Sequence, residues 1–223
     1  MTDPGKAENL GNEAKEARAA VEHGQHIRDE IRGITLAALR RGRLDAQGIR
    51  RVVRSVTQGA SLGVAGAGDK SRAALSEALA GIDEALAKSA EATKLAVEEA
   101  AGRLRDYGKR DLERTFDDLR ALEGMFLDTV KDVADSSAGA TQEILQGLWQ
   151  HARASGTEAG ATATAAIAAL EQKLGRTLRE VAAAGTDAAL AASANLAEAA
   201  SGLLAGIAEA LDAKAKSMRH AKK

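Results

Sequence analysis

The chain has 223 residues, of which 45% are apolar and only 2% are aromatic, with a net charge of −1, one proline and no cysteine. The missing β-branched and aromatic signature argues against a sheet, the absence of cysteine excludes disulfides and thiol chemistry, and the near-zero charge excludes a general attraction to nucleic acid. Alanine, the best helix former, supplies much of the apolar fraction but buries little area per residue. We therefore expect an all-α protein of long amphipathic helices, elongated and arranged as a bundle or an extended hairpin.

No stretch of the sequence predicts a membrane span or an export signal. Residues 1–26 lack the apolar core of a signal peptide. The sequence contains no uncharged run of about 18 apolar residues, the length that a membrane-spanning helix needs. The stretch that comes nearest, residues 188–204, is mostly alanine and is interrupted by Asn195 and Glu198. We expect a cytoplasmic protein without a transmembrane segment.

The first part of the chain divides into a polar start and a helical pair. Residues 1–20 are polar with mixed charges, which predicts a disordered tail. Residues 21–57 predict a short N-terminal helical hairpin, with one helix over about 21–41, an end at Gly42 and a second helix over 44–56.

Positive charge gathers on this hairpin. Two interpretations stand: a patch for an anionic surface, either phospholipid or nucleic acid, or a solvated helix face paired with acidic residues elsewhere, such as Asp117, Asp118 and Glu123. The second is the more usual role of a charge run, and a nucleic-acid partner is not favoured. The residues of this basic patch are Arg40, Arg41, Arg43, Arg50, Arg51 and Arg54.

Residues 58–71 contain four glycines, Gly59, Gly63, Gly66 and Gly68. The end of the stretch approaches a phosphate-binding loop, but Asp69 stands where a lysine must follow the glycine, and no strand precedes it. We predict a flexible glycine-rich linker and no cofactor.

Residues 72–154 form the next predicted segment, an amphipathic helical region with apolar positions in steps of three and four and a break near residues 107–108. It should be the best packed part, because every aromatic residue of the chain lies in it. A second break is predicted at residues 155–157, where Thr157 can cap the following helix and Glu158 lies near its positive end.

Residues 155–216 predict a long alanine-rich helix, followed by a basic tail over 217–223. From residue 167 to residue 211, apolar positions recur in an eleven-residue unit, which makes three turns at about 3.67 residues per turn. The stripe therefore stays on one side of a nearly straight helix and can lie on an apolar surface or pack against partner helices. The candidate surface-binding residues are Ile167, Leu170, Leu174, Leu178, Val181, Leu196, Leu203, Ile207 and Leu211.

No arrangement of residues predicts catalysis. His23 and His26 lie near Glu22 and Glu30, but a metal needs three or four converging ligands. Paired acids occur without an apolar pocket that would raise one pKa, and the serines lack a recognisable histidine and acid. We predict no catalytic, metal or cofactor residues and no enzymatic activity.

The alanine-rich texture, and above all residues 90–156 with the run Tyr-Gly-Lys-Arg-Asp-Leu-Glu-Arg-Thr-Phe at 107–116, resembles the phasins, bacterial proteins that coat intracellular polyester granules. The resemblance implies a non-enzymatic amphiphile that adsorbs to a hydrophobic inclusion and self-associates as a homo-oligomer. Two alternatives stay open: a self-associating helical scaffold that binds neither lipid nor polymer, and a stress protectant similar to late-embryogenesis proteins.

Overall fold

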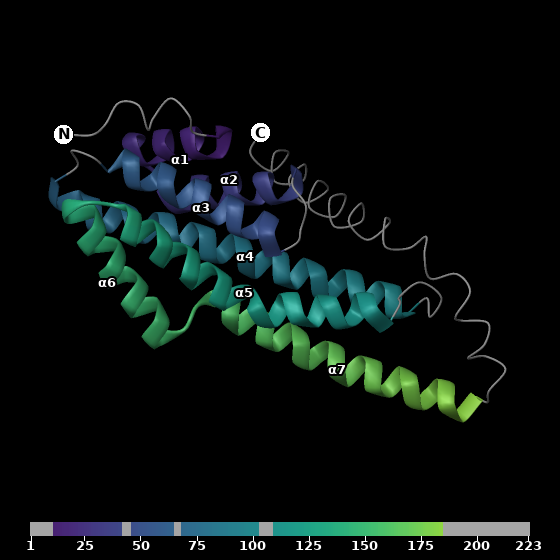
Figure 1. Cartoon of the computed structure of the whole chain (residues 1–223). Coiled ribbons are helices and arrows are strands. Elements are labelled where there is room, and N and C mark those ends of the chain that lie inside the picture. Colours follow the sequence, from purple (N-terminus) through teal and green to yellow (C-terminus); the bar gives the residue numbers. More distant parts are fainter. Residues whose placement is uncertain (1–10, 42–45, 65–67, 103–108, 185–223) are drawn as a thin grey trace. The chain divides into compact units, whose positions relative to one another are not determined.

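The computed structural model describes residues 11–41, 46–64, 68–102 and 109–184 (Figure 1). Every regular element in these ranges is helical, which confirms the predicted all-α fold. No helix among these residues has the length and apolar character needed to cross a membrane. The elements are α1 (Asn12–His23), α2 (Ile27–Arg41), α3 (Ala46–Gly63), the 3₁₀ turn η2 (Gly68–Lys70), α4 (Ser71–Gly102), α5 (Lys109–Ser136), α6 (Gly139–Ser155) and α7 (Glu158–Ala184).

The chain divides into two compact units. The first consists of Met1–Lys88 and Ala121–Ala161, and the second of Ser89–Arg120 and Thr162–Lys223. Helices α4, α5 and α7 each contribute residues to both units.

Helices α1, α2 and α3 pack together at the start of the first unit, with α1 lying mainly along α3 (Figure 1). Their contact depends on glycines in α3. A Cβ atom at Gly59 would collide with the backbone carbonyl of Ala14, and one at Gly63 would lie 2.7 Å from the carbonyl oxygen of Arg18. Small residues thus let the two helix backbones approach closely, and the face of α1 that contains Ala14 and Ala17 is buried.

This contact corrects the prediction of a disordered tail over residues 1–20. Residues 12–23 form α1, with Ala17 fully buried and Ala20 2% exposed; residues 1–10 lie outside the described residues. The prediction was wrong because alanine carries little hydrophobic signal in the sequence, yet it packs well against a glycine-bearing helix. The single helix predicted over 21–41 is also divided, since Gly24 has a φ of 68° and ends α1.

The predicted linker over residues 58–71 needs a similar correction. Helix α3 continues beyond the predicted end at Val56 as far as Gly63, so Gly59 and Gly63 are helical and buried. Their spacing of four residues places both on the face that meets α1. Gly68, with a φ of 55° and open space around its Cβ position, does occupy a turn, whereas Gly66 lies outside the described residues.

A cluster of ion pairs ties α2 to α4. Arg32 Nη1 donates hydrogen bonds to both carboxylate oxygens of Glu84 at 2.9 Å, and Lys88 Nζ lies 3.0 Å from Glu84 Oε1. Burial raises the pKa of Glu84, but hydrogen bonds from Lys88 and Arg32 outweigh it and lower the pKa from 4.5 to about 2. Glu84, whose side chain is only 16% exposed, is therefore held as a carboxylate.

The region predicted over residues 72–154 contains a break that the sequence analysis missed. Helix α5 ends at Ser136, where the hydroxyl groups of Ser136 and Ser137 both donate to the carbonyl oxygen of Val133. Gly139, with a φ of 60°, then starts α6 in a new direction. The predicted break at 155–157 is confirmed, because α6 ends at Ser155 and α7 begins at Glu158.

Candidate functional site

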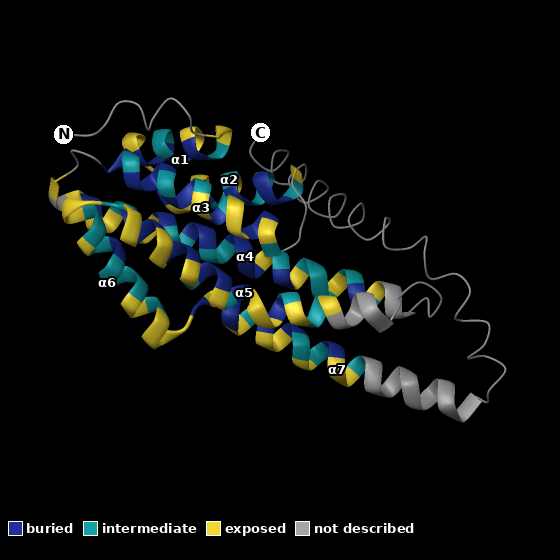
Figure 2. Cartoon of the chain, in the orientation of Figure 1, coloured by how far each residue is buried: buried dark blue, intermediate teal, exposed yellow. Residues whose placement is uncertain are grey.

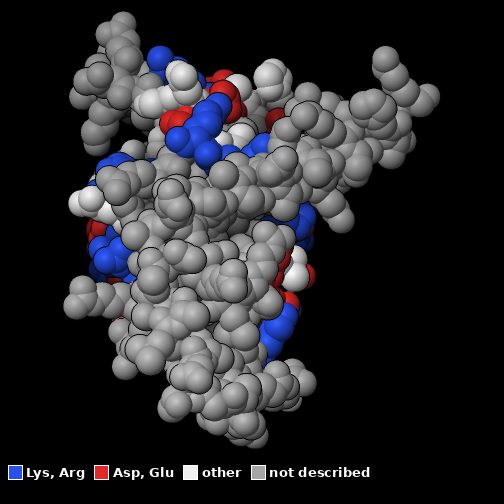
Figure 3. All heavy atoms as spheres, turned by 90° about the vertical axis from the view of Figure 1, so that its right-hand side faces the viewer, with Lys and Arg blue, Asp and Glu red and all other residues white. Residues whose placement is uncertain are grey.

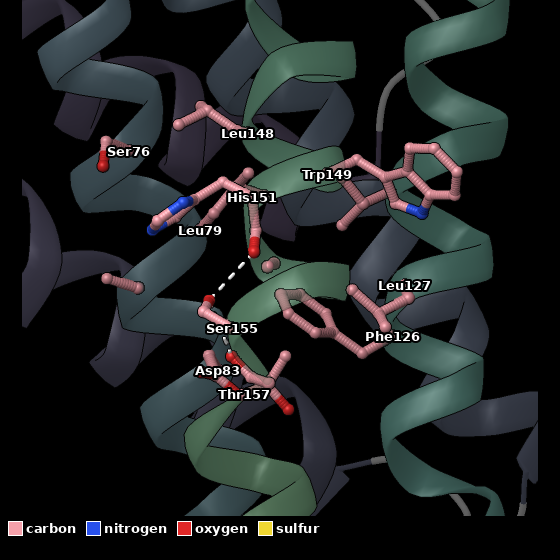
Figure 4. Close-up of a pocket in the computed structure, with 14 residues that line it drawn as sticks. Ser76, Leu79, Asp83, Phe126, Leu127, Leu148, Trp149, His151, Ser155 and Thr157 are labelled. Atoms are coloured by element: carbon pink, nitrogen blue, oxygen red, sulfur yellow. Dashed lines mark hydrogen bonds between the residues drawn. The ribbon is translucent and has the colours of Figure 1, made fainter.

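Within the first unit, side chains of α4, α5 and α6 and of the turn after α6 line a groove of about 170 Å³ (Figure 4). Phe126 and Val130 of α5 are buried, whereas Leu79 of α4 and Leu148 and Trp149 of α6 are only half-buried. A cavity of about 150 Å³ with apolar walls is large enough to hold benzene. The groove therefore has room for an apolar group of that size. Its polar lining consists of Ser76, Asp83, His151, Ser155 and Thr157.

Helix α6 contributes one side of this groove and is thinly anchored. All of its residues are described, and Leu145 is the only buried one. Figure 2 accordingly shows α6 mostly in the colours of intermediate and exposed residues. The Trp149 ring is flanked by the Arg153 guanidinium, 5.3 Å from the ring centroid, which is another contact within α6.

The two ends of α6 are glycine turns. Gly139 and Gly156 have φ angles of 60° and 79°, in the region that side-chain-bearing residues disfavour. The residue that precedes α6, Ala138, makes no side-chain capping hydrogen bond. The beginning of α6 thus leaves its first backbone N–H groups without a side-chain partner from the cap position.

The start of α7, in contrast, is firmly held by other helices. The N–H groups of Glu158 and Ala159 donate to the two carboxylate oxygens of Asp83 in α4, at 2.8 and 2.9 Å. Gly160 N–H donates to the Thr157 hydroxyl oxygen at 3.0 Å. The predicted capping role of Thr157 is thereby confirmed, and the three free N–H groups of the first turn all have acceptors.

A second carboxylate, Glu123 of α5, completes this anchor. Its Oε1 accepts hydrogen bonds from the backbone N–H and the hydroxyl group of Thr157, at 3.0 and 3.1 Å. Burial raises the pKa of Asp83; hydrogen bonds from Ala159 and Glu158 oppose this rise, and the nearby charge of Glu123 adds to it. Two carboxylates at a helix N-terminus are favourable because that end carries partial positive charge. The sequence did not predict Asp83 and Glu123 as anchors, because each accepts hydrogen bonds from a helix that is distant in sequence.

The groove brings together a serine, a histidine and an aspartate, which no spacing in the sequence predicted. Their hydrogen bonds do not connect them as a catalytic triad. The Ser155 hydroxyl donates to the backbone carbonyl oxygen of His151 at 2.9 Å (Figure 4), and both oxygens of Asp83 are bound to the start of α7. The side chain of His151 is exposed, and its ring has no hydrogen bond to either partner among the described residues.

The predicted surface-binding stripe begins in the second unit. Leu170 is 1% exposed and Ile167 is half-buried, and Ala163 and Ala166 are buried beside them. Glu171 Oε1 lies 3.7 Å from Nη2 of Arg120 in α5. Lys173 Nζ lies 3.8 Å from Oε2 of Glu98 in α4. The described start of the stripe therefore packs inside the chain. The side chains of Leu174, Leu178 and Val181, and all of Leu196, Leu203, Ile207 and Leu211, lie outside the described residues.

Two arginines of the predicted basic patch, Arg41 and Arg54, form ion pairs with acidic residues of other helices. Arg41 Nη2 lies 3.7 Å from Glu13 Oε1, and Arg54 Nη2 lies 2.6 Å from Asp132 Oδ2. Arg40 is half-buried, and Arg50 and Arg51 are exposed. Arg43 lies outside the described residues. On the face drawn in Figure 3, basic and acidic side chains of the described residues lie next to one another.

Two of the three acidic partners suggested for this patch, Asp117 and Glu123, bind other residues, which corrects that part of the prediction. Asp117 pairs with Arg120 of its own helix, and Glu123 anchors Thr157. Among the described residues, no group of three or more histidines or acids is placed to hold a metal ion.

Comparison with known proteins gives a family. Residues 5–213 match DUF6781, a family of unknown function, and the chain belongs to that family. No curated protein matches the chain, and no solved structure matches it either.

Proposed function

We propose that this chain is a non-enzymatic helical protein that adsorbs to a hydrophobic surface within the cytoplasm, such as a polyester granule or a lipid droplet. This is the role that the resemblance to phasins implies. The observation that carries the proposal is the thin anchoring of α6 beside an apolar groove: one buried residue, Leu145, in the whole helix. We propose that α6 lifts about Gly139 while α7 stays anchored at Thr157.

The resting fold offers little for adsorption. Among the described residues, Leu95 is the only large apolar side chain that is exposed, at 54%. Opening of α6 would present Phe126 and Val130 together with the half-buried Leu79 and Leu148. The half-buried side chains would gain burial on a droplet that they lack in the closed fold, at about 25 cal/mol per Å² of apolar area.

Opening in water costs the burial of every side chain that it exposes, which includes Leu145, Phe126 and Val130. Full re-exposure of each costs about 1.5–3 kcal/mol, and a surface that accepts the same side chains returns those terms. An amphipathic helix released in this way lies in an interface with its apolar face down. The predicted stripe from Leu174 to Leu211 is a separate candidate contact with the surface, and self-association there would follow from the stripes of neighbouring copies.

A second function, a self-associating helical scaffold without lipid or polymer, is favoured by a different observation. Leu170 is already buried in the second unit and is flanked by the ion pairs of Glu171 and Lys173. A stripe that prefers helices of its own chain would also accept helices of a second copy.

Cross-linking α6 to α4 separates the two functions. The chain has no cysteine, so Ala80→Cys with Ala152→Cys, which line the groove from α4 and α6, gives one defined pair for a short bismaleimide. The matched control is the same variant with both thiols capped by N-ethylmaleimide. We expect the capped protein to float with uncharged oil or polyester droplets and the cross-linked protein to stay in solution.

Two results would count against adsorption through α6. Equal flotation of both forms would show that α6 does not need to move. No flotation of either form, together with a discrete oligomer by sedimentation, would favour the scaffold.

A further inference from the structure

The outward face of α3 has two exposed arginines, Arg50 and Arg51. No acidic side chain among the residues that the structure describes forms an ion pair with either one. Their neighbour Arg54 pairs with Asp132, and Arg41 pairs with Glu13, but these arginines are themselves 51% and 58% exposed. Exposed pairs of this kind are weak and can exchange partners.

The rest of α3 fixes where these arginines point. Its opposite face is buried, with Val53 and Val56 at 1% and 0% exposed and Ala60 at 1%. Residues Arg50 and Arg54, four apart on a helix whose other side is packed, therefore share one solvent-facing side. Because the apolar face of α3 is already covered, this surface can act only through its charges and not by inserting into an apolar phase.

We propose that this arginine face, made of Arg50, Arg51 and Arg54, binds the phosphate groups of an anionic phospholipid surface. Guanidinium groups match phosphate oxygens with two parallel N–H donors. Residues 40–54 carry six arginines and one aspartate, whereas the whole chain has a net charge of −1. That asymmetry orients the molecule so that this face, rather than the rest of the chain, meets a negative surface.

Phospholipid fits this face better than nucleic acid does. Helix α3 contains no aromatic residue, so it offers no ring of its own on which a base could stack. Nucleic-acid affinity depends on many phosphate contacts. Three arginines, one of them paired with Asp132, offer only a few such contacts. This inference concerns a different surface from the groove beside α6 and does not depend on adsorption to apolar droplets.

Vesicle binding by the full chain tests the proposal. The probes are vesicles of phosphatidylcholine alone and of phosphatidylcholine with about 30 mol% phosphatidylglycerol, and each basic residue near such a surface adds about fivefold to partitioning. We expect binding only to the anionic vesicles, weakened by salt. Arg50→Gln with Arg51→Gln should reduce it about 25-fold, whereas Arg50→Lys with Arg51→Lys should retain most of it.

The matched control removes two charges from elsewhere on the same unit. Lys70, the last residue of η2, and Arg72, in the first turn of α4, are both exposed. Lys70→Gln with Arg72→Gln should leave vesicle binding within about twofold. Circular dichroism confirms that each variant is folded, and flotation on uncharged droplets should be the same for all of them.

Three results would overturn the proposal. Equal binding to neutral and anionic vesicles would remove the role of charge. An equal loss in the Lys70 and Arg72 variant would show that any cation serves. A labelled DNA duplex that displaces the chain from the vesicles, with the same dependence on Arg50 and Arg51, would assign the face to nucleic acid.

Discussion

Gly59 offers the sharpest test of how the first unit is packed. An alanine in a helix interior is normally more stable than a glycine by about 1 kcal/mol. At Gly59, however, the added Cβ would collide with the backbone carbonyl of Ala14. A backbone atom cannot rotate away as a side chain can, so Gly59→Ala must push α1 off α3.

The size of the effect follows from what α1 buries. Ala14, Ala17 and Ala20 are 0–2% exposed and Val21 is 5% exposed. Each alanine methyl group contributes about 0.8 kcal/mol of burial and the valine about 1.5 kcal/mol. Partial loss of these terms, set against the gain in helix propensity, predicts a net destabilisation of about 1–3 kcal/mol.

Gly33 provides the control for this substitution. It lies on the exposed side of α2, and its Cβ position has no other atom within 4 Å. Gly33→Ala should therefore stabilise the protein by about 0.5–1 kcal/mol. Urea denaturation followed by circular dichroism compares the two variants, and hydrogen exchange of the α1 amides reports local release of that helix.

The opposite signs are the test. If Gly59→Ala stabilises the protein as much as Gly33→Ala does, and the α1 amides stay protected, then α1 does not pack against α3 as described. A shared loss in both variants would also refute the argument, because Gly33 has no contact to lose.

Three further predictions concern the anchors of the two units. Thr157→Val removes the hydroxyl that caps α7 and should cost about 1 kcal/mol in urea denaturation; no loss would mean that Asp83 alone suffices. Glu84→Gln should cost about 1–3 kcal/mol at neutral pH. Because the pKa of Glu84 is lowered from 4.5 to about 2, the wild-type advantage should be complete above pH 4.5 and fade as the pH falls towards 2; an advantage independent of pH would contradict this. Leu170→Ala should cost about 2–5 kcal/mol, whereas Arg120→Gln, which removes exposed pairs, should change stability by less than about 1 kcal/mol; equal small effects would show that Leu170 is not buried.

Local signals in the sequence predicted the features that depend on few neighbours. The break at residues 155–157 and the cap at Thr157 were correct, because glycine and threonine define a helix boundary within a single turn. The all-α class followed in the same way from alanine content and the lack of strand formers.

The remaining features depend on contacts between distant segments. Helix α1 was missed because Ala14 and Ala17 become core residues only when Gly59 lies opposite them. The anchor at the start of α7 was missed because Asp83 and Glu123 belong to α4 and α5. They are separated in sequence from their partners Glu158 and Thr157 by 75 and 34 residues. The apolar period of α7 was visible, but the pattern alone did not say that Leu170 packs inside the chain.

The emission of Trp149, the single tryptophan of the chain, tests most directly whether α6 opens onto an apolar surface. Trp149 lies on α6 at the groove and is half-buried beside Arg153. With droplets that contain a brominated hydrocarbon, we predict a blue shift and strong quenching in the thiol-capped Ala80→Cys, Ala152→Cys protein and neither change in its cross-linked form. Droplet-bound protein whose Trp149 emission is unchanged would contradict the account, because α6 would then have stayed closed.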